Sequence, residues 1–321
     1  MYSFFKTVLL FFISIQIFAG DSIKEIISEP ISDSKDIFYL NKKYSFKEYK
    51  SIKENEIEKF KNLNSEFYKK VKFNYTYLKY FNIAYACSSS DFNLLFNKMR
   101  IFFYDTYPKY FNQEPRFTVR VVLFKNKLEF EREMEAGGSY GFYFPEEKHW
   151  TPTAKTFFSY CGSGPGTAWH EMIHPFVDFF AKDTQQWFNE GFASFYEMGS
   201  TTEKNFIEGY TNWRHPELQD IIRRKKLTPL KQFLLEEDMK EDYGYAYSRF
   251  SFCYLWMKNL MIPFVKEYLF ELYPHYKGKK LGEKSIESLE RLTGKNIQDI
   301  QNELESLALK LKKNEKLKQS K

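Results

Sequence analysis

The sequence contains few histidines and few cysteines. Its 321 residues include 5 His and 3 Cys, and no two cysteines have the CxxC spacing of a thiolate metal or redox site. An odd count allows at most one pair within the chain. Cys87 and Cys161 each close an expected strand and could face one another, or all three thiols could stay unpaired. Cys253 lies in an apolar helical stretch, which favours a buried thiol.

Apolar runs long enough to cross a membrane are also absent. The run from Val8 to Phe18 is shorter than the ~20 apolar residues that a span requires, and it includes a serine and a glutamine. Lys6 precedes the run and small residues follow it, which is the layout of a secretory signal peptide rather than of an uncleaved anchor. We therefore expect cleavage near Ala19, export to a periplasmic or extracellular location, and no transmembrane segment in the mature chain.

Basic residues are concentrated at the C-terminus. The formal net charge is +6, and residues 310–321 contain six lysines and one glutamate, so the rest of the chain is near neutral. A nucleic-acid-binding face needs basic residues clustered on the folded body, and this distribution therefore disfavours a nucleic-acid partner. We expect the tail to be a solvated helix end, with weak attraction to an anionic surface as the alternative.

The order of the expected elements indicates an α+β protein. The predicted segments are a signal peptide at 1–19, a lead-in with a charged helix at 20–74, a mixed sheet half at 75–200, a mostly helical half at 201–313 and a lysine-rich tail at 314–321. Strands are expected at 79–87, 116–124, 139–144 and 154–161. Helices are expected at 45–70, 91–107, 127–136, 187–199, 229–237, 245–260, 264–274, 283–293 and 296–313.

The stretch "TAWHEMIHPFVDFFAKDTQQWFNEGFASFYE", residues 167–197, contains two histidines four positions apart. Residues at i and i+4 share one helix face, so His170 and His174 can present both imidazoles to a single ion. Glu171 would lie close enough to a metal-bound water to act as a general base. Zinc binds such ligands and is catalytic when three protein ligands leave one position open. The alternative is an amphipathic helix with surface histidines.

A third ligand is needed to complete such a site. A metzincin would place a histidine where this chain has Phe180, so that class is excluded. Glu190 is the leading candidate, with Asp178 and Asp183 as rivals. Pro175 cannot donate a helical hydrogen bond, and we expect the helix to kink or end soon after the second histidine.

"HEMIH" followed by "WFNEGFASFYE" resembles the gluzincin metallopeptidases, and most of all the smaller peptidase MA-like proteins, over residues 79–260. The resemblance implies a zincin-like fold, in which a mixed sheet and an active-site helix precede a mostly helical C-terminal half. It implies that His170, His174 and Glu190 bind zinc and that Glu171 is the base. Glu197 matches a further acidic position, which implies that it orients a ligand histidine, and a surface carboxylate is the alternative. The exopeptidase motif of the large aminopeptidase gluzincins is missing.

The resemblance extends to the segment "DYGYAYSRFSFCYLW", which contains three closely spaced tyrosines. In gluzincins a tyrosine from this region helps to stabilise the oxyanion of the tetrahedral intermediate. Tyr245 matches best, and Tyr243 and Tyr247 are the alternatives. The remaining possibility is that the tyrosine packs in the core and has no catalytic role.

The expected strand at 139–144 is predicted to be the edge strand that pairs with an extended substrate backbone. A buried sheet strand is the alternative. The residues predicted to contact the substrate are Gly141, Phe142 and Tyr143.

Together these features predict an exported, zinc-dependent, endopeptidase-like hydrolase that acts on a peptide or protein substrate. A catalytically silent envelope protein of zincin-like fold, with a binding or structural role, is the main alternative. A zinc amidase acting on cell-wall peptides is a weaker one. Glu171 favours the enzyme, because a purely structural zinc site needs no base.

Overall fold

The computed structural model describes residues 37–63, 70–111, 113–135, 138–146 and 155–320. The expected signal peptide, 1–19, and the lead-in up to residue 36 lie outside these ranges. Within the described ranges, no helix has both the length and the apolar composition needed to cross a membrane.

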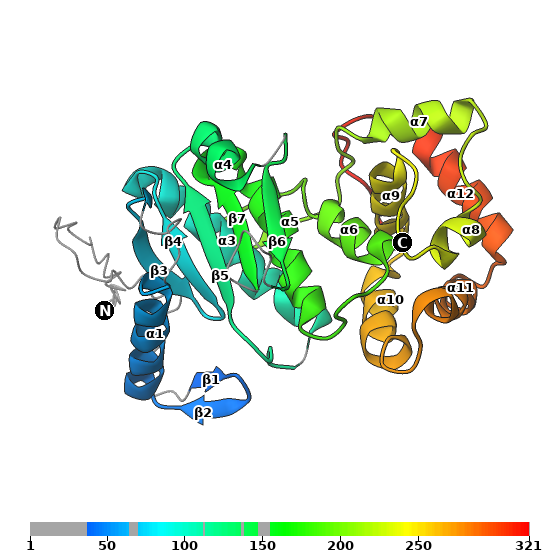
Figure 1. Cartoon of the computed structure of the whole chain (residues 1–321). Helices are drawn as coiled ribbons and strands as arrows, with labels where there is room; N and C mark the ends of the chain where they lie inside the picture. Colours follow the sequence, from blue (N-terminus) through cyan, green and yellow to red (C-terminus); the bar gives the residue numbers. More distant parts are fainter. Residues whose placement is uncertain (1–36, 64–69, 112, 136–137, 147–154, 321) are drawn as a thin grey trace, which may run out of the picture.

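A five-stranded mixed sheet forms the N-terminal half of the molecule (Figure 1). The three central strands are parallel, and each edge strand runs antiparallel to its neighbour. This arrangement confirms the α+β class. In spatial order the strands are β3 (Asn74–Leu78), β4 (Phe81–Tyr85), β5 (Val119–Phe124), β7 (Thr156–Tyr160) and β6 (Gly141–Phe144).

The strand expected at 79–87 is the second arm of a hairpin. β3 and β4 pair through five residues each, and the turn between them contains Lys79 with a φ of 43°. The left-handed region usually takes Gly, Asn or Asp, so a lysine there gave no sign of a turn. The other three expected strands enclose β5, β6 and β7.

Residues alternate between two faces of the sheet, as the strand repeat requires. Ile83, Val121 and Phe157 belong to the larger core, which also includes buried residues of α3 and α5. Ala84, Val122 and Phe158 belong to a smaller core that includes α4. Among the described residues of this half, the helices are α1 (Phe46–Lys61), α3 (Ser89–Tyr110), α4 (Lys127–Met134) and α5 (Pro165–Asp178).

A disulfide joins Cys87 and Cys161, whose Cα atoms are 6.2 Å apart. It ties the segment between β4 and α3 to the turn that leads from β7 into α5, and so settles the alternative that the sequence left open. Cys253 is unpaired and buried, as expected.

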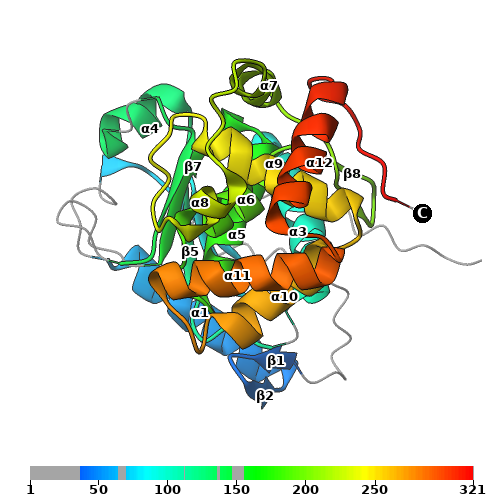
Figure 2. The same cartoon turned by 90° about the vertical axis from the view of Figure 1, so that its right-hand side faces the viewer.

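The C-terminal half is mainly helical, with α6 packed between α5 and α9 (Figures 1 and 2). The sequence did not predict α7 or the two short hairpins, β1–β2 and β8–β9. The first hairpin precedes the sheet half and consists of β1 (Ile37–Tyr39) and β2 (Lys42–Tyr44). The described elements of the C-terminal half are α6 (Gln186–Phe195), β8 (Ser200–Thr201), β9 (Phe206–Ile207), α7 (His215–Arg223), α8 (Leu230–Leu235), α9 (Gly244–Met257), α10 (Met261–Glu267), a π-helix (Tyr268–Leu272), α11 (Gly278–Thr293) and α12 (Ile297–Lys310).

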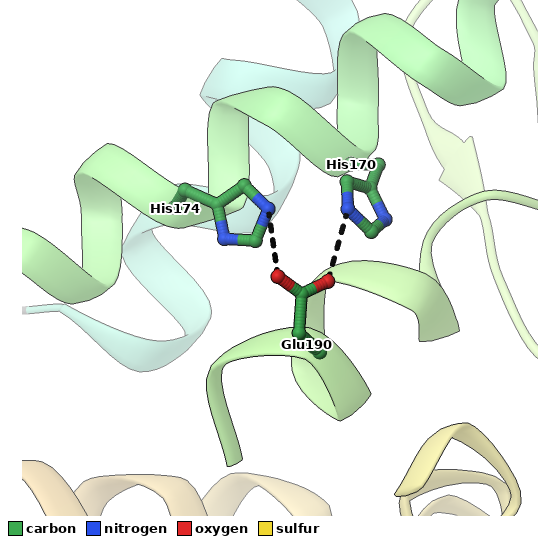
Figure 3. Close-up of side chains that lie close together, drawn as sticks. All are labelled: His170, His174 and Glu190. Atoms are coloured by element: carbon green, nitrogen blue, oxygen red, sulfur yellow. Dashed lines mark ion pairs between the residues drawn. The ribbon is translucent and has the colours of Figure 1, made fainter. Parts of the chain in front are cut away.

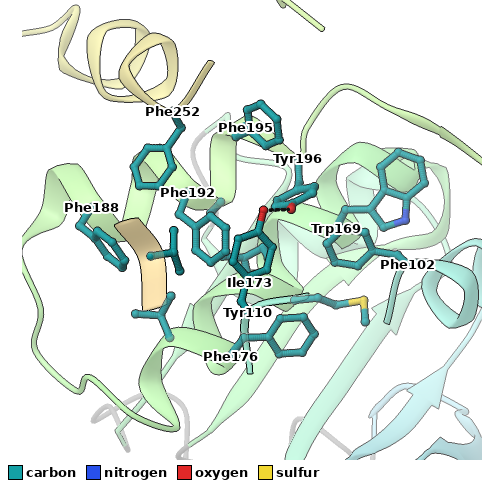
Figure 4. Packing of buried hydrophobic residues seen from close by; sticks show 14 of the residues in the cluster. Phe102, Tyr110, Trp169, Ile173, Phe176, Phe188, Phe192, Phe195, Tyr196 and Phe252 are labelled. Atoms are coloured by element: carbon teal, nitrogen blue, oxygen red, sulfur yellow. Dashed lines mark hydrogen bonds between the residues drawn. The ribbon is translucent and has the colours of Figure 1, made fainter. Parts of the chain in front are cut away.

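Aromatic side chains from α3, α5, α6 and α9 fill the core that joins the two halves (Figure 4). Phe102 packs edge-on against Tyr196 at 5.1 Å between ring centres, and Phe192 stacks on Phe252 at 5.6 Å. The buried hydroxyl of Tyr196 donates a 2.8 Å hydrogen bond to that of Tyr110. These contacts hold α6, the helix that carries the third candidate ligand, against α3 and α9.

The prediction of a solvated C-terminal tail is wrong for the backbone of residues 311–320. Leu317 is only 3% exposed, and its amide donates to the carbonyl of Gly209 at 2.8 Å. The amide of Ser320 donates to the carbonyl of Met257 at 2.7 Å. The lysines of this segment remain exposed, so the backbone, the Leu317 side chain and the Gln319 amide, which donates to the carbonyl of Trp256, hold the tail to the body.

Candidate metal centre

Helix α5 begins at Pro165, a residue that suits the first turn of a helix. Pro175 lies inside the helix, which ends three residues later at Asp178, in agreement with the expected early end. Phe179 closes the last turn by donating its amide to the carbonyl of Pro175 at 2.9 Å. The two histidines precede the proline and keep their i, i+4 relationship, with ring centres 4.8 Å apart.

Gly166 permits a close approach between the start of α5 and the end of α6. A β-carbon at this position would lie 2.2 Å from the carbonyl oxygen of Glu197. Any side chain here would therefore push the two helices apart. The contact brings Glu190 and Glu197, both from α6 or its end, beside the histidines of α5.

His170, His174 and Glu190 converge (Figure 3). The Nε2 atom of His170 lies 3.5 Å from Oε2 of Glu190, and Nε2 of His174 lies 3.9 Å from Oε1. One ligand atom from each residue falls within 4.8 Å of the others, so the group could hold a metal ion.

The two rival carboxylates lie apart from this group. Oδ2 of Asp178 accepts hydrogen bonds from the Tyr143 hydroxyl at 2.7 Å and from Nζ of Lys155 at 3.1 Å. Asp183 is exposed in the loop between α5 and α6. Among the described residues neither is placed with the two histidines as a potential ligand.

Each imidazole has an oxygen partner at its other nitrogen. Nδ1 of His170 lies 3.2 Å from Oε1 of Glu197, and Nδ1 of His174 lies 3.1 Å from Oδ1 of Asn189. The His170 contact has an ion-pair distance but not the geometry of a hydrogen bond. In the neutral form of the two rings, a proton on each Nδ1 would leave both Nε2 lone pairs directed at the space beside Glu190. The sequence indicated Glu197. It did not indicate that Asn189 contacts His174. The one available signal was that Asn189 directly precedes the candidate ligand Glu190.

Glu197 has further polar partners that the sequence did not reveal. Nδ2 of Asn212 donates to its Oε2 at 2.9 Å, and Nη1 of Arg214 forms an ion pair with the same oxygen. Burial alone would raise the pKa of Glu197, but hydrogen bonds and charge from His170 and Arg214 outweigh burial and lower it to about 2. Glu197 is therefore a buried anion that can hold a proton on Nδ1 of His170.

Glu171 is only 5% exposed, and no described residue forms a hydrogen bond or ion pair with its carboxylate. Burial raises the pKa of Glu171 to about 8, with a further contribution from Glu190 and Glu197 and an opposing one from His170. Without a metal the side chain is therefore largely protonated near neutral pH. A buried carboxyl group with such a pKa is suited to proton transfer.

The histidines differ in their charge. Burial disfavours protonation of His170, but the interactions of its ring with the carboxylates of Glu190 and Glu197 outweigh burial and raise its pKa to about 10. Burial lowers the pKa of His174. The site therefore attracts one positive charge to His170 and leaves His174 neutral. A divalent cation would displace the proton on Nε2 of His170, as metal binding to imidazole requires.

A cavity of about 960 Å³ opens beside these residues, between the sheet half and the helical half. Tyr245 lies on its wall, 38% exposed, with the Arg214 guanidinium 5.7 Å from its ring centre. Tyr243 is buried and its hydroxyl bonds to Thr228. Tyr247 is buried too. Of the three tyrosines, Tyr245 is the one that reaches the cavity.

β6 borders the same cavity. Among the described strands it pairs only with β7, so it is an edge strand there. The side chains of the strand alternate, since Tyr143 bonds to Asp178 on the side of α5 while Phe142 packs 5.7 Å from Phe130, in the smaller core. The candidate substrate-contacting residues Gly141, Phe142 and Tyr143 all line the cavity.

No protein-family model matches the chain, and no curated protein matches it. The fold and the site define an α+β protein in which two histidines of one helix and a glutamate of the next could hold a metal ion beside a large cavity.

Proposed function

We propose that the protein is an exported zinc metallopeptidase of the gluzincin type, with a zincin-like fold and an endopeptidase-like action on peptide or protein substrates. The observation that carries this proposal is that His170, His174 and Glu190 converge at a cavity that also contains Glu171. The signal-peptide pattern at residues 1–19 supports export.

Zinc suits the donor atoms present. Two imidazole nitrogens and one carboxylate are a common ligand set for catalytic zinc, and three protein ligands leave a position free. When bound, zinc polarises a carbonyl group and lowers the pKa of water, which supplies a nucleophile near neutral pH.

Glu171 is the general base in this proposal. It accepts a proton from the attacking water and then delivers it to the leaving amine. A metal cation bound by the neighbouring ligands would lower the pKa of Glu171 from the value of about 8 that it has in the metal-free protein. The carboxylate would then be ionised under the conditions in which it must act.

Tyr245 and β6 contact the substrate in this proposal. The Tyr245 hydroxyl donates a hydrogen bond to the oxygen on which negative charge develops. The open edge of β6 binds an extended peptide through backbone hydrogen bonds, as strand addition does. A strand edge recognises a peptide backbone rather than a chain end, which favours an endopeptidase-like action.

The first test is the zinc content of the mature protein, by elemental analysis after dialysis. We expect about one zinc per chain in the wild type and a clear loss in Glu190→Ala, which removes one of three protein ligands. Asp183→Asn is the matched control, since it neutralises another carboxylate on the same cavity and should retain zinc. A folded wild type that binds no zinc when zinc is supplied would overturn the proposal.

The second test separates an enzyme from a binding protein. Glu171→Gln should keep its zinc and lose hydrolysis of a mixed peptide library, measured by mass spectrometry. A wild type that binds zinc but cleaves no peptide in the library would favour the catalytically silent envelope protein.

A further inference from the structure

The segment 209–214 connects β9 to α7 and supplies two of the groups that hold Glu197. Asn212 is 1% exposed and donates to Oε2 of Glu197, and Arg214 forms an ion pair with the same atom. Glu197 in turn lies against Nδ1 of His170. The position of this segment therefore decides how firmly one of the candidate ligands is oriented.

The C-terminal tail holds the segment through Thr211, which is fully buried. The amide of Thr211 donates to the carbonyl of Glu315 at 2.9 Å, and its hydroxyl donates to the carbonyl of Lys312 at 2.5 Å. The amide of Glu315 donates back to the same hydroxyl at 2.8 Å. Asn212 is the next residue, so the tail contacts end one peptide bond away from a partner of Glu197.

Two further contacts extend this attachment along the tail. Tyr210 and Lys316 form an antiparallel bridge, and the Leu317 amide donates to the carbonyl of Gly209 at 2.8 Å. The Leu317 side chain is buried in the main core. The tail thus adds a short strand-like pairing and one apolar anchor to the segment.

Helix α9 fixes the same segment to α6. Arg249 is 2% exposed, and its Nε donates to the carbonyl of Ser194 at 2.8 Å while its Nη2 donates to the carbonyl of Tyr210. Ser194 belongs to α6, the helix that carries Glu190. The segment is therefore bound both to the body of the helical half and to the tail.

We propose that residues 311–320 are a positioning element of the metal centre, which holds Thr211 so that Asn212 and Arg214 keep Glu197 against His170. The inference rests on the proposed function in one respect, which is that zinc is the metal whose affinity is measured. The tail touches none of the ligands and acts through a connected set of hydrogen bonds. Substitution of a group that orients a metal ligand typically weakens metal binding by about 10–100-fold, and the tail should act at the lower end of that range.

The test uses the full-length mature protein and three variants. Thr211→Val removes the hydroxyl and keeps the shape of the side chain. A second variant ends at Asn314 and so lacks Glu315 and Leu317. Lys318→Ala is the matched control, since it changes an exposed lysine of the same tail. Circular dichroism establishes that each variant is folded, and Thr211→Val decides the matter if the shortened chain does not fold.

Two quantities are measured in the folded proteins. The first is zinc affinity, by competition with a chelator, which should weaken about 10-fold in Thr211→Val and in the shortened chain and not in Lys318→Ala. The second is the Nδ1 proton of His170 in the metal-free protein, observed by ¹⁵N-edited NMR. Its signal should shift or exchange faster in the first two variants.

Unchanged zinc affinity together with an unchanged His170 signal in folded Thr211→Val would overturn the inference, because the tail would then affect stability alone. The NMR measurement needs neither metal nor substrate. If the protein bound no zinc or cleaved no peptide, the proposed function would be wrong. The NMR measurement would still show whether the tail affects His170.

Discussion

Gly141 of β6 lies directly against Glu171 of α5. A β-carbon at Gly141 would lie 2.9 Å from both Cγ and Oε1 of Glu171 and 3.1 Å from Cγ2 of Thr167. The edge strand and the candidate base are therefore packed so closely that only glycine fits without a shift. The candidate base therefore occupies space that a side chain at Gly141 would take.

Gly141→Ala should reduce peptide hydrolysis without loss of zinc. The added methyl group displaces Glu171, and a shift of about 1 Å in a catalytic group can lower the rate about 100-fold. The rate constant kcat and the zinc content are measured together. Gly162→Ala is the control, because its β-carbon would meet nothing closer than 3.6 Å. Equal activity of Gly141→Ala and wild type would show that this contact does not position the base.

The stability of the metal-free protein should depend on pH through Glu171. Its pKa is raised from 4.5 to about 8 in the folded state. Between these values the folded protein holds a proton that the unfolded chain has lost, so stability falls as pH rises, by up to about 1.4 kcal/mol per unit. Glu171→Gln cannot ionise, and its stability relative to wild type should increase from about pH 5 to about pH 8.5. Urea denaturation of both chelator-treated proteins measures the difference, and parallel curves at the two pH values would contradict it.

Glu197→Gln should weaken zinc binding about 10–100-fold, because a neutral amide holds the proton on Nδ1 of His170 less strongly than a carboxylate does. Competition with a chelator measures the change. Glu203→Gln neutralises an exposed carboxylate in the β8–β9 hairpin and should bind zinc as tightly as the wild type. If both variants bound zinc equally, Glu197 would have no part in orienting the ligand.

Tyr245→Phe should lower kcat about 100–1,000-fold, the usual effect of removing one donor to a developing oxyanion. Zinc affinity should not change, because the hydroxyl is not a ligand. Tyr243→Phe is the comparison: it loses the bond to Thr228 and should cost about 1 kcal/mol of stability with little effect on kcat. A larger loss of kcat in Tyr243→Phe than in Tyr245→Phe would reverse the assignment.

Removal of the disulfide by Cys87→Ser with Cys161→Ser should destabilise the protein. The bond spans a sequence separation of 74 residues, and the loop-entropy model gives about 4 kcal/mol for a loop of that length. Urea denaturation with wild type and variant side by side measures the loss. Reductant should destabilise the wild type similarly and leave the variant unchanged. A variant as stable as the wild type would mean that the unfolded chain is hardly constrained by the bond.

The sequence was enough to predict the relative position of the two histidines and four of the five strands of the sheet, for physical reasons. The i, i+4 spacing of His170 and His174 determines their relative position once a helix forms, and period-2 alternation marks the strands. Glu190 was the leading candidate for the third ligand, and a resemblance implied its role, but its approach to the histidines depends on the contact at Gly166, which no periodicity reveals.

The sequence could not predict the groups around Glu197. Asn212 and Arg214 lie in an irregular segment that also contacts residues about 100 positions further along the chain, such as Glu315, which bonds to Thr211. Long-range contacts of this kind leave no local pattern. Leu317 was missed because a single apolar residue among lysines has no period, and α7 because it has only 9 residues.

The docking of the tail also has a consequence for the order in which contacts form during synthesis. Lys312, Glu315 and Leu317 come after every candidate ligand in the sequence, so they leave the ribosome later than the ligands do. A chain cleaved before residue 311 would contain every candidate ligand and still lack the contacts of these residues to Gly209 and Thr211. The segment that holds Glu197 would therefore gain its full set of contacts only after residues 312–317 have been synthesised.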